Sequence, residues 1–181
     1  MANTELLPRP GAGFILRRLS TGDLAAFQRY RQDVELGRYQ GWLPTPDQQA
    51  RTFLAEMSRA PFPNPGHWTQ IGIAEPGHGL LIGDVGVYLD EAATYAEIGF
   101  TLARFAQGRG VATAAIRELI KLVFECSSAE RVIGVTDARN LPSMRLMERA
   151  GMRLTATNQA VFRGEPCVEH TYTVTRAGAC S

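Results

Sequence analysis

The stretch Gln107-Gly-Arg-Gly-Val-Ala112 joins a predicted strand, residues 94–102, to a long amphipathic helix that is expected to begin after Gly110. Free backbone N–H groups and the positive end of the helix dipole meet at such a junction, and together they suit a pyrophosphate. Gly108 and Gly110 let the backbone approach an anion closely. Because glycines also serve a plain strand–helix turn, the loop by itself leaves both interpretations open.

The segments on both sides of this loop predict the sheet. A short buried strand at 131–136 follows the helix, so residues 96–136 form a strand–helix–strand unit, expected to be parallel and right-handed. Strand-like runs at 67–75, 80–89 and 94–102 are joined by turns that are too short for parallel crossovers. These runs therefore predict an antiparallel meander.

The two ends of the chain add further elements. They are a strand at 14–19, helices starting at Ser20-Thr-Gly-Asp23 and Thr45-Pro46-Asp47, a helix at 141–150, and strands around 153–163 and 168–175. Together the segments predict an α+β fold: a mixed, mostly antiparallel central sheet of about seven strands, with helices on both faces and one parallel β-α-β crossover.

Length and composition fit one globular domain. The 181 residues, 45% hydrophobic and 20% charged, favour a single domain over 1–181, with flexible tails expected at 1–12 and 177–181. A formal charge of +1 argues against nucleic acid as a partner. The chain has no apolar run of about 18 residues that would predict a membrane span, and residues 1–13 lack a secretory signal. A cytoplasmic location without membrane contact is therefore expected.

The three cysteines, Cys126, Cys167 and Cys180, are widely spaced and form neither a zinc pattern nor a redox dithiol. They are expected to be free thiols, with Cys126 a small core residue and Cys180 part of the C-terminal tail. Neither a catalytic cysteine nor a metal site is predicted.

Two short motifs carry a family resemblance. Gln107-x-x-Gly110-x-Ala112 resembles the Q/R-x-x-G-x-G/A acetyl-CoA signature of the GCN5-related N-acetyltransferases, and it follows the strand Glu97-Ile-Gly-Phe-Thr-Leu102 as in that family. The segment from Asn140-Leu-Pro-Ser143 to Arg149-Ala-Gly151-Met152 is similar to the family's N-x-x-S/A … G-F segment. Each motif alone is short, but the two motifs together are specific for this family.

The resemblance extends over residues 13–176. Trp42-x-Pro44 and the run Ala96-Glu-Ile-Gly-Phe100 look most like the branch that modifies ribosomal-protein N-termini. The resemblance to the family implies the family fold and acetyl-CoA as cosubstrate without a metal. It also implies direct transfer of the acetyl group to a primary amine, either a protein N-terminus or a small-molecule amine. The acceptor and the oligomeric state, a homodimer included, stay open.

The family's cofactor contacts carry over to three short segments of this chain. They are the strand end Phe100, Thr101 and Leu102, whose edge the family frees by splaying its fourth and fifth strands; the loop and first helical turn Gln107, Gly108, Arg109, Gly110, Val111, Ala112 and Thr113; and the later helix start at Asn140 and Ser143. The resemblance also implies that a backbone N–H between Phe100 and Leu102 donates to the oxyanion.

Acetyl transfer to an amine needs a group that accepts the amine's proton and a group that protonates the departing thiolate. Glu97 is the predicted base, acting through ordered water, because strand alternation sends it to the face opposite Ile98. An acid on a solvated sheet face or in a salt bridge is the alternative interpretation of Glu97. Glu169 and His170 are weaker candidates for the base or for amine recognition.

The proton donor departs from the family pattern. The family's general-acid tyrosine stands seven residues after the motif asparagine, where this chain has Met147. The role is therefore assigned to Ser143, whose hydroxyl is expected to reach the thioester sulfur. Alternatively, Ser143 takes part only in the helix start, with Asn140 as the cap. Tyr172 on the last strand is a second candidate, although a strand tyrosine usually packs in a core.

Two other functions stay open on the sequence alone. A degenerate acyl-CoA-binding or sensing module would keep the loop without the chemistry. A dinucleotide enzyme would use the same strand–loop–helix unit, with Asp137 as the ribose-binding acid. Against the dinucleotide interpretation, Gly108-x-Gly110-x-x-Thr113 lacks the third small residue of the fingerprint, and hairpins join the preceding strands.

Overall fold

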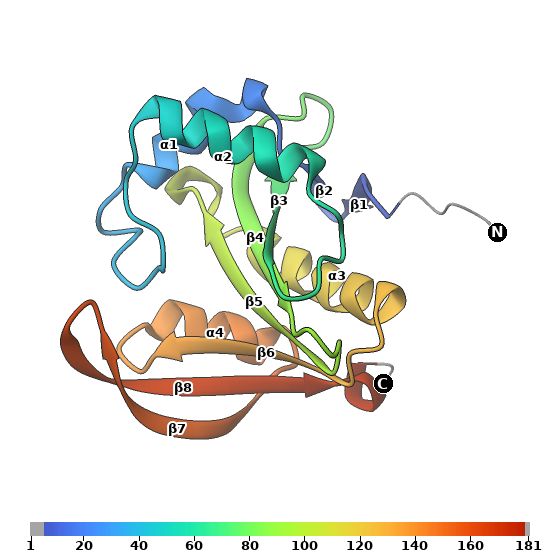
Figure 1. The fold of residues 1–181 in the computed structure, drawn as a ribbon, viewed down its shortest axis with the longest axis vertical. Helices are drawn as coiled ribbons and strands as arrows, with labels where there is room; N and C mark the ends of the chain where they lie inside the picture. Colours follow the sequence, from blue (N-terminus) through green and yellow to red (C-terminus); the bar gives the residue numbers. More distant parts are fainter. Residues whose placement is uncertain (1–5, 180–181) are drawn as a thin grey trace.

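One eight-stranded sheet forms the centre of the fold (Figure 1). The computed structural model describes residues 6–179. Its strands are β1 (Arg9–Gly11), β2 (Phe14–Arg18), β3 (Trp68–Ala74), β4 (Leu81–Leu89), β5 (Tyr95–Leu102), β6 (Arg131–Asp137), β7 (Arg153–Phe162) and β8 (Glu165–Thr175). In the order β1-β2-β3-β4-β5-β6-β8-β7, neighbours are antiparallel except β5 and β6, which run parallel. The predicted mixed sheet with one parallel crossover is thus confirmed.

Helices cover both faces of this sheet, as the sequence predicted. They are α1 (Leu24–Arg31), α2 (Asp47–Arg59), α3 (Val111–Cys126), α4 (Leu141–Arg149) and the short α5 (Arg176–Ala179), with 3-10 turns η1 (Thr21–Asp23) and η2 (Arg104–Ala106). The apolar stripe of α3 and the inner side of α4 bury against one face in the larger core, which includes Ile98 and Val132. On the other face α1 and α2 form a smaller core around Phe27 and Leu54.

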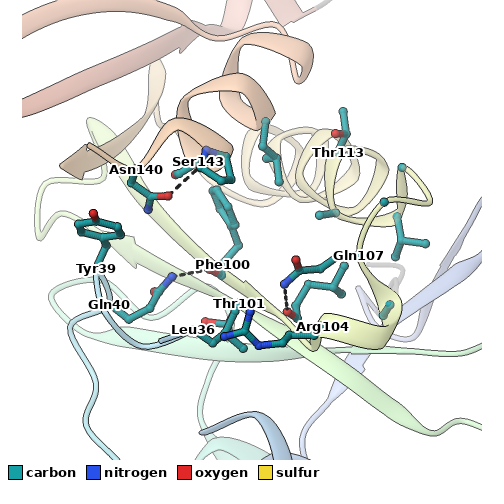
Figure 2. A pocket seen from close by; sticks show the side chains of 18 of the residues that line it. Leu36, Tyr39, Gln40, Phe100, Thr101, Arg104, Gln107, Thr113, Asn140 and Ser143 are labelled. Atoms are coloured by element: carbon teal, nitrogen blue, oxygen red, sulfur yellow. Dashed lines mark hydrogen bonds between the residues drawn. The ribbon is translucent and has the colours of Figure 1, made fainter. Parts of the chain in front are cut away.

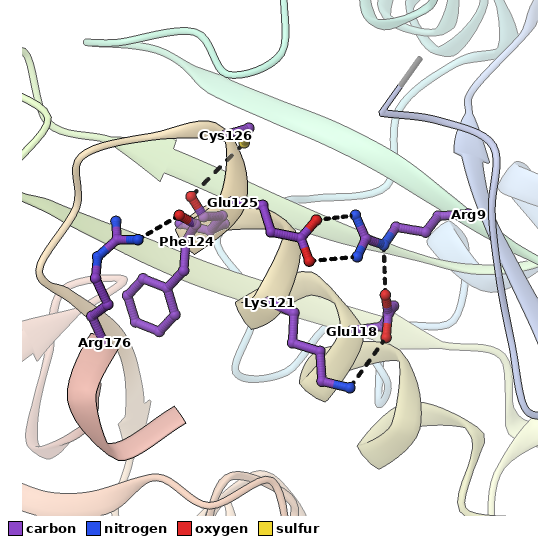
Figure 3. Close-up of polar contacts among 8 residues, drawn as sticks. Arg9, Glu118, Lys121, Phe124, Glu125, Cys126 and Arg176 are labelled. Carbon is purple, nitrogen blue, oxygen red and sulfur yellow. Dashed lines mark hydrogen bonds and ion pairs between the residues drawn. The ribbon is translucent and has the colours of Figure 1, made fainter. Parts of the chain in front are cut away.

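The eighth strand is β1, which lies in a segment for which the sequence predicted a flexible tail. Arg9 holds this strand beside α3: its guanidinium contacts Glu118 at 2.5 Å and Glu125 at 2.6 Å and 2.8 Å (Figure 3). These ion pairs join residues more than a hundred positions apart, so no local pattern could indicate them. Residues 9–11 therefore form a paired strand within the segment for which a tail was expected.

At the other end, residues 177–179 belong to α5, while Cys180 lies outside the described residues. Arg176 fixes the start of this helix by donating to the carbonyl oxygens of Phe124, Ser127 and Ala129. The two described cysteines are free. Burial raises the pKa of the Cys126 thiol to about 11, so this thiol is unreactive near neutral pH.

The last two strands form a hairpin whose turn is tighter than the sequence indicated. Strand β8 begins at Glu165, three residues before its predicted start. Arg163 and Gly164 both have positive φ, 51° and 82°, and together they form a two-residue turn. Because such turns match the twist of the flanking strands, pairing continues up to the turn.

Candidate active site

The glycine loop lies at the N-terminus of α3. Gly108 and Gly110 both have φ of +77°, a left-handed conformation that residues with a Cβ rarely adopt. A Cβ built on either glycine would meet no protein atom within 4 Å. The two glycines are thus required by the backbone path rather than by close packing, and the backbone of the loop borders open space. The dipole of the α3 helix adds partial positive charge there.

The parallel pair β5 and β6 opens beside this loop. Their pairing covers Tyr95, Ala96 and Glu97 and does not continue along the rest of β5. In Figure 1 the two strands start together and separate toward their C-terminal ends. The splay that the resemblance implied is therefore present, and it leaves the edge of β5 near Phe100 and Leu102 without a neighbouring strand.

Two glutamine side chains donate hydrogen bonds to backbone carbonyl groups along the open edge of β5. Gln40 Nε2 donates to the Phe100 oxygen at 3.2 Å, and Gln107 Nε2 donates to the Leu102 oxygen at 2.9 Å (Figure 2). The side chain of Gln107 therefore ties the glycine loop to the end of β5. This contact gives the first residue of the motif a structural role in holding the loop.

Open strand edge, glycine loop and α4 border one cavity of about 640 Å³. Of the residues predicted to hold a cofactor, the following line it: Phe100, Thr101, Leu102, Gln107, Gly108, Gly110, Val111, Ala112, Thr113, Asn140 and Ser143. Arg109 is not among the lining residues, and its guanidinium donates to the carbonyl of Phe105. One cavity therefore brings together three segments that the sequence placed far apart.

The start of α4 brings Asn140 and Ser143 to the cavity (Figure 2). Asn140 caps the helix, since its Oδ1 accepts a hydrogen bond from the backbone N–H of Ser143 at 3.4 Å. Pro142 in the first turn needs no hydrogen bond there. The cap uses the backbone of Ser143 and leaves its hydroxyl available to the cavity.

The two other positions considered for the proton donor lie in the core. Met147 is 1% exposed, and its sulfur packs against Gly134, where an added Cβ would approach within 2.5 Å. Tyr172 is also 1% exposed, and its hydroxyl donates to Glu148 at 3.2 Å. Burial and this hydrogen bond raise the pKa of Tyr172. Neither residue lines the cavity, whereas Ser143 does.

Glu97 is the last residue of β5 that pairs with β6. It is half-buried and does not line the cavity directly, while its neighbour Ile98 is buried in the core beneath α3. Burial, and next the negative charge of Glu169 on β8, raise the pKa of Glu97. A carboxyl group with a raised pKa beside an opened strand edge has the properties of a proton acceptor for an amine.

The sequence indicated only part of the cavity wall that lies opposite the glycine loop. Residues Glu35, Leu36, Tyr39 and Gln40 line the cavity from the segment between α1 and α2, and Arg104 lines it from η2. The aromatic run Tyr39-Gln-Gly-Trp42 was a signal for this segment, but nothing local showed that it folds over β5. Asp137, the candidate ribose-binding acid, is bound by Arg139 at 2.6 Å and 2.9 Å, and this contact lowers its pKa.

Among residues 6–179, no cluster of three or more His, Cys, Asp or Glu side chains is arranged to hold a metal ion. No helix in the described part of the chain is long and apolar enough to cross a membrane.

The fold and the opened cavity match those expected of an acetyltransferase. A family model described as an acetyltransferase (GNAT) domain matches residues 14–153. The chain therefore belongs to the GNAT family of N-acetyltransferases, which confirms the family that the sequence predicted.

Individual relatives are distant. The Uncharacterized N-acetyltransferase p20 of Bacillus licheniformis is 27% identical over 134 residues, 73% of this chain and 74% of that protein. A GNAT-family acetyltransferase structure from Bacillus anthracis has a TM-score of 0.78 at 20% identity, covering 92% of this chain and 96% of that one. The ribosomal L7/L12 alpha-N-protein acetyltransferase RimL, solved with coenzyme A, has a TM-score of 0.78 at 16% identity, covering 93% and 97%. At these identities the two structures show the fold.

Proposed function

We propose that the protein uses acetyl-CoA to acetylate a primary amine by direct attack in a ternary complex. The observation that carries this proposal is the opening between β5 and β6 beside the Gln107–Ala112 loop, because both border the same cavity. Family membership supports the reaction class. The similarly folded RimL structure, which contains coenzyme A, supports the choice of cosubstrate.

The residues around the cavity fit acetyl-CoA. The backbone at Gly108 and Gly110 faces open space, as a bound pyrophosphate requires, and the dipole of α3 favours its negative charge. Bound acetyl-CoA supplies an activated acetyl thioester. The residues proposed to hold it are Phe100, Thr101, Leu102, Gln107, Gly108, Arg109, Gly110, Val111, Ala112, Thr113, Asn140 and Ser143.

Two side chains are assigned to proton transfer. Glu97 accepts the proton of the attacking amine through ordered water, since its raised pKa brings it closer to that of an amine. The Ser143 hydroxyl donates a hydrogen bond or a proton to the departing thiolate. Backbone N–H groups between Phe100 and Leu102 stabilise the negative charge that develops on the carbonyl oxygen.

The proposed acceptor is a protein N-terminus or a small-molecule amine, in a cytoplasmic protein without nucleic-acid or membrane partners; a homodimer is compatible with this proposal. The carboxyl groups of Glu97 and Glu169 favour a cationic amine on the β8 side of the opening. The RimL fold supports the N-terminus as the first acceptor to test.

A thermal-shift and thiol-release experiment tests the proposal. Acetyl-CoA and CoA at about a hundred times Kd should stabilise the fold by ~2.7 kcal/mol, and NAD should not. CoA thiol should then appear with at least one amine from a panel of short peptides, spermidine, free amino acids and an aminoglycoside. Equal shifts with NAD would favour the dinucleotide alternative. Binding without thiol release with every amine would favour a sensing module.

A further inference from the structure

The segment between α1 and α2, residues 32–46, forms the wall of the cavity opposite the glycine loop (Figure 2). We name it the acceptor loop. It contains no strand or α-helix, and a loop of this length without regular structure is uncommon in a compact domain and is usually functional. Such a loop needs anchors, because each ordered backbone residue costs conformational entropy.

One anchor comes from the tip of the β7–β8 hairpin, which lies beside the acceptor loop in Figure 1. Arg163 Nη2 donates to the carbonyl oxygens of Gln40 at 2.9 Å, Trp42 at 2.9 Å and Gly37 at 3.2 Å. One guanidinium nitrogen is thus within hydrogen-bond distance of three carbonyl oxygens of the loop. These contacts connect segments more than 120 residues apart.

The side chains at two of these three positions reach β5 where the strands separate. Gln40 donates to the carbonyl of Phe100, and the Trp42 indole N–H donates to the Thr101 hydroxyl at 3.2 Å. Arg163 therefore fixes the backbone of the same two residues whose side chains contact Phe100 and Thr101 on β5. The position of the cavity wall relative to β5 depends on this arrangement.

The backbone of Arg163 gives an independent indication. Its φ of +51° lies in the left-handed region, where the two-residue turn prefers Asn, Asp or Gly. Within the hairpin the exposed side chain lies 5.1 Å from the centre of the Phe162 ring, and its hydrogen bonds reach the acceptor loop. Strain of this kind persists where the surroundings use the residue for something else. What arginine supplies and asparagine lacks is a guanidinium that reaches the acceptor loop.

We propose that Arg163 is a positioning residue for the acceptor: it holds the acceptor loop at the width that the incoming amine requires. This inference rests on the proposed function, and it concerns the acceptor side of the cavity alone. Arg163 makes no hydrogen bond to the glycine loop or to α4, and it reaches Phe100 and Thr101 only through Gln40 and Trp42. Acetyl-CoA affinity should therefore depend on Arg163 much less than acceptor affinity does.

Arg163→Met tests this directly, because it keeps the length of the side chain and removes the donors. We expect the acceptor KM to rise about five- to fiftyfold, the range for one to a few lost hydrogen bonds from a charged group. The acetyl-CoA Kd should stay within about twofold, and kcat should change less than KM. The acceptor used is the best substrate of the peptide, polyamine, amino-acid and aminoglycoside panel.

Three further variants separate positioning from general stability. Arg163→Lys should recover much of the acceptor affinity, since one ammonium nitrogen carries three N–H donors for the three carbonyls. Arg163→Asn loses the same hydrogen bonds but suits the turn, so it should melt higher than Arg163→Met, yet it should raise the acceptor KM as the methionine variant does. Arg153→Met, at the open end of the same hairpin, is the matched control and should change neither the acceptor KM nor the melting temperature.

Amide hydrogen exchange supplies a readout that needs no acceptor. In Arg163→Met, exchange should accelerate in residues 32–46 and stay unchanged in α3. Unchanged exchange in the acceptor loop would overturn the inference, as would equal losses of acceptor and acetyl-CoA affinity. If the wild-type protein acetylates no amine of the panel, the proposed function fails, and the exchange experiment still decides whether Arg163 holds the loop.

Discussion

The two walls of the cavity are built in different ways. The wall proposed to hold the cofactor, called the cofactor wall below, consists of the end of β5, the Gln107–Ala112 loop, the first turn of α3 and the start of α4. Its shape comes from backbone conformation and helix ends. The wall proposed to face the acceptor, called the acceptor wall below, consists of residues 32–46, and side chains from distant segments hold it in place. A wall made of backbone suits a constant ligand such as a nucleotide, whereas a wall held by side chains can change with the acceptor.

Arginine side chains are the main anchors of the acceptor wall, and their burial differs widely. Arg31, 5% exposed, contacts Asp84 in the core and lies 4.6 Å from the centre of the Trp42 ring. Arg104 binds Asp33 on the surface at 2.5 Å. Because water screens exposed pairs and not buried ones, these two anchors should differ greatly in their effect on stability.

Arg31→Met should give the largest effect. Asp84, 1% exposed, would keep one hydrogen bond from Tyr30, at 2.5 Å, and lose its buried counter-ion. We expect unfolding free energy to fall by about 3–5 kcal/mol, the usual cost of breaking a buried ion pair. Urea denaturation measures this change, and a loss below about 1 kcal/mol would contradict the assignment of Arg31 as a main anchor.

Two control variants sharpen this result. Arg104→Met removes an exposed pair and should leave the stability almost unchanged. The double variant Arg31→Met with Asp84→Leu replaces both charges by apolar groups and should recover part of the lost stability. If the double variant is as unstable as the single one, the stacking of Arg31 on Phe27 and Trp42 contributes more than the ion pair does.

The same contrast explains what the sequence could predict. The strand–loop–helix unit around Gly110 is contiguous, so periodicity and glycine placement predicted the loop that borders the cavity, and Asn140 could be recognised as a helix cap. Arg163 and Gln40 could not be assigned, because their partners lie far along the chain. Strand β1 was missed for the same reason, since its contact with α3 depends on Arg9.

On the cofactor wall, Ser143→Ala should lower kcat by about 10–1000-fold, with acetyl-CoA affinity within a few-fold of the wild type. The lower half of the range is favoured because a CoA thiolate leaves partly unaided. The Asn140 cap uses the backbone of Ser143, so the fold should survive. Steady-state thiol release measures kcat, and Ser58→Ala on α2 is the matched control.

Different outcomes for the Ser143 experiment identify different donors. Wild-type kcat in Ser143→Ala together with a loss in Tyr172→Phe would assign the acid to the last strand, although Tyr172 now binds Glu148. If both variants keep their turnover, the thiolate takes its proton from water, and catalysis depends on positioning the amine.

Gly110→Val should weaken acetyl-CoA binding at least tenfold, because branched carbons would enter the open space beside the loop. Gly77→Val is the matched control: Gly77 also has a positive φ, +87°, and open surroundings, but it lies on the β3–β4 turn. Equal backbone strain should then destabilise both variants similarly, and only the first should lose affinity. Isothermal titration compares them, and unchanged affinity in Gly110→Val would contradict the assignment of the loop.

The smallest effect is expected at Glu97, which lies where the pairing of β5 with β6 ends. The folded state raises its pKa above the ordinary 4.5, so at intermediate pH the folded state binds more protons than the unfolded state. The stability due to this group is complete below pH 4.5 and is lost as pH rises through the folded-state pKa. At neutral pH Glu97 therefore destabilises the fold slightly, and Glu97→Gln should melt a little higher than the wild type.

The activity of Glu97→Gln should change in the opposite direction, and this opposition separates a base from a structural acid. As the base, Glu97 makes kcat/KM fall as pH drops below its raised pKa, whereas the glutamine variant should lack this dependence and have lower activity at neutral pH. If Glu97 were a salt-bridged or solvated acid, its replacement would lower or preserve the melting temperature and leave the pH profile unchanged. Glu169→Gln offers a further check: because the charge of Glu169 helps to raise the pKa of Glu97, its removal should shift the acidic limb of the profile to lower pH.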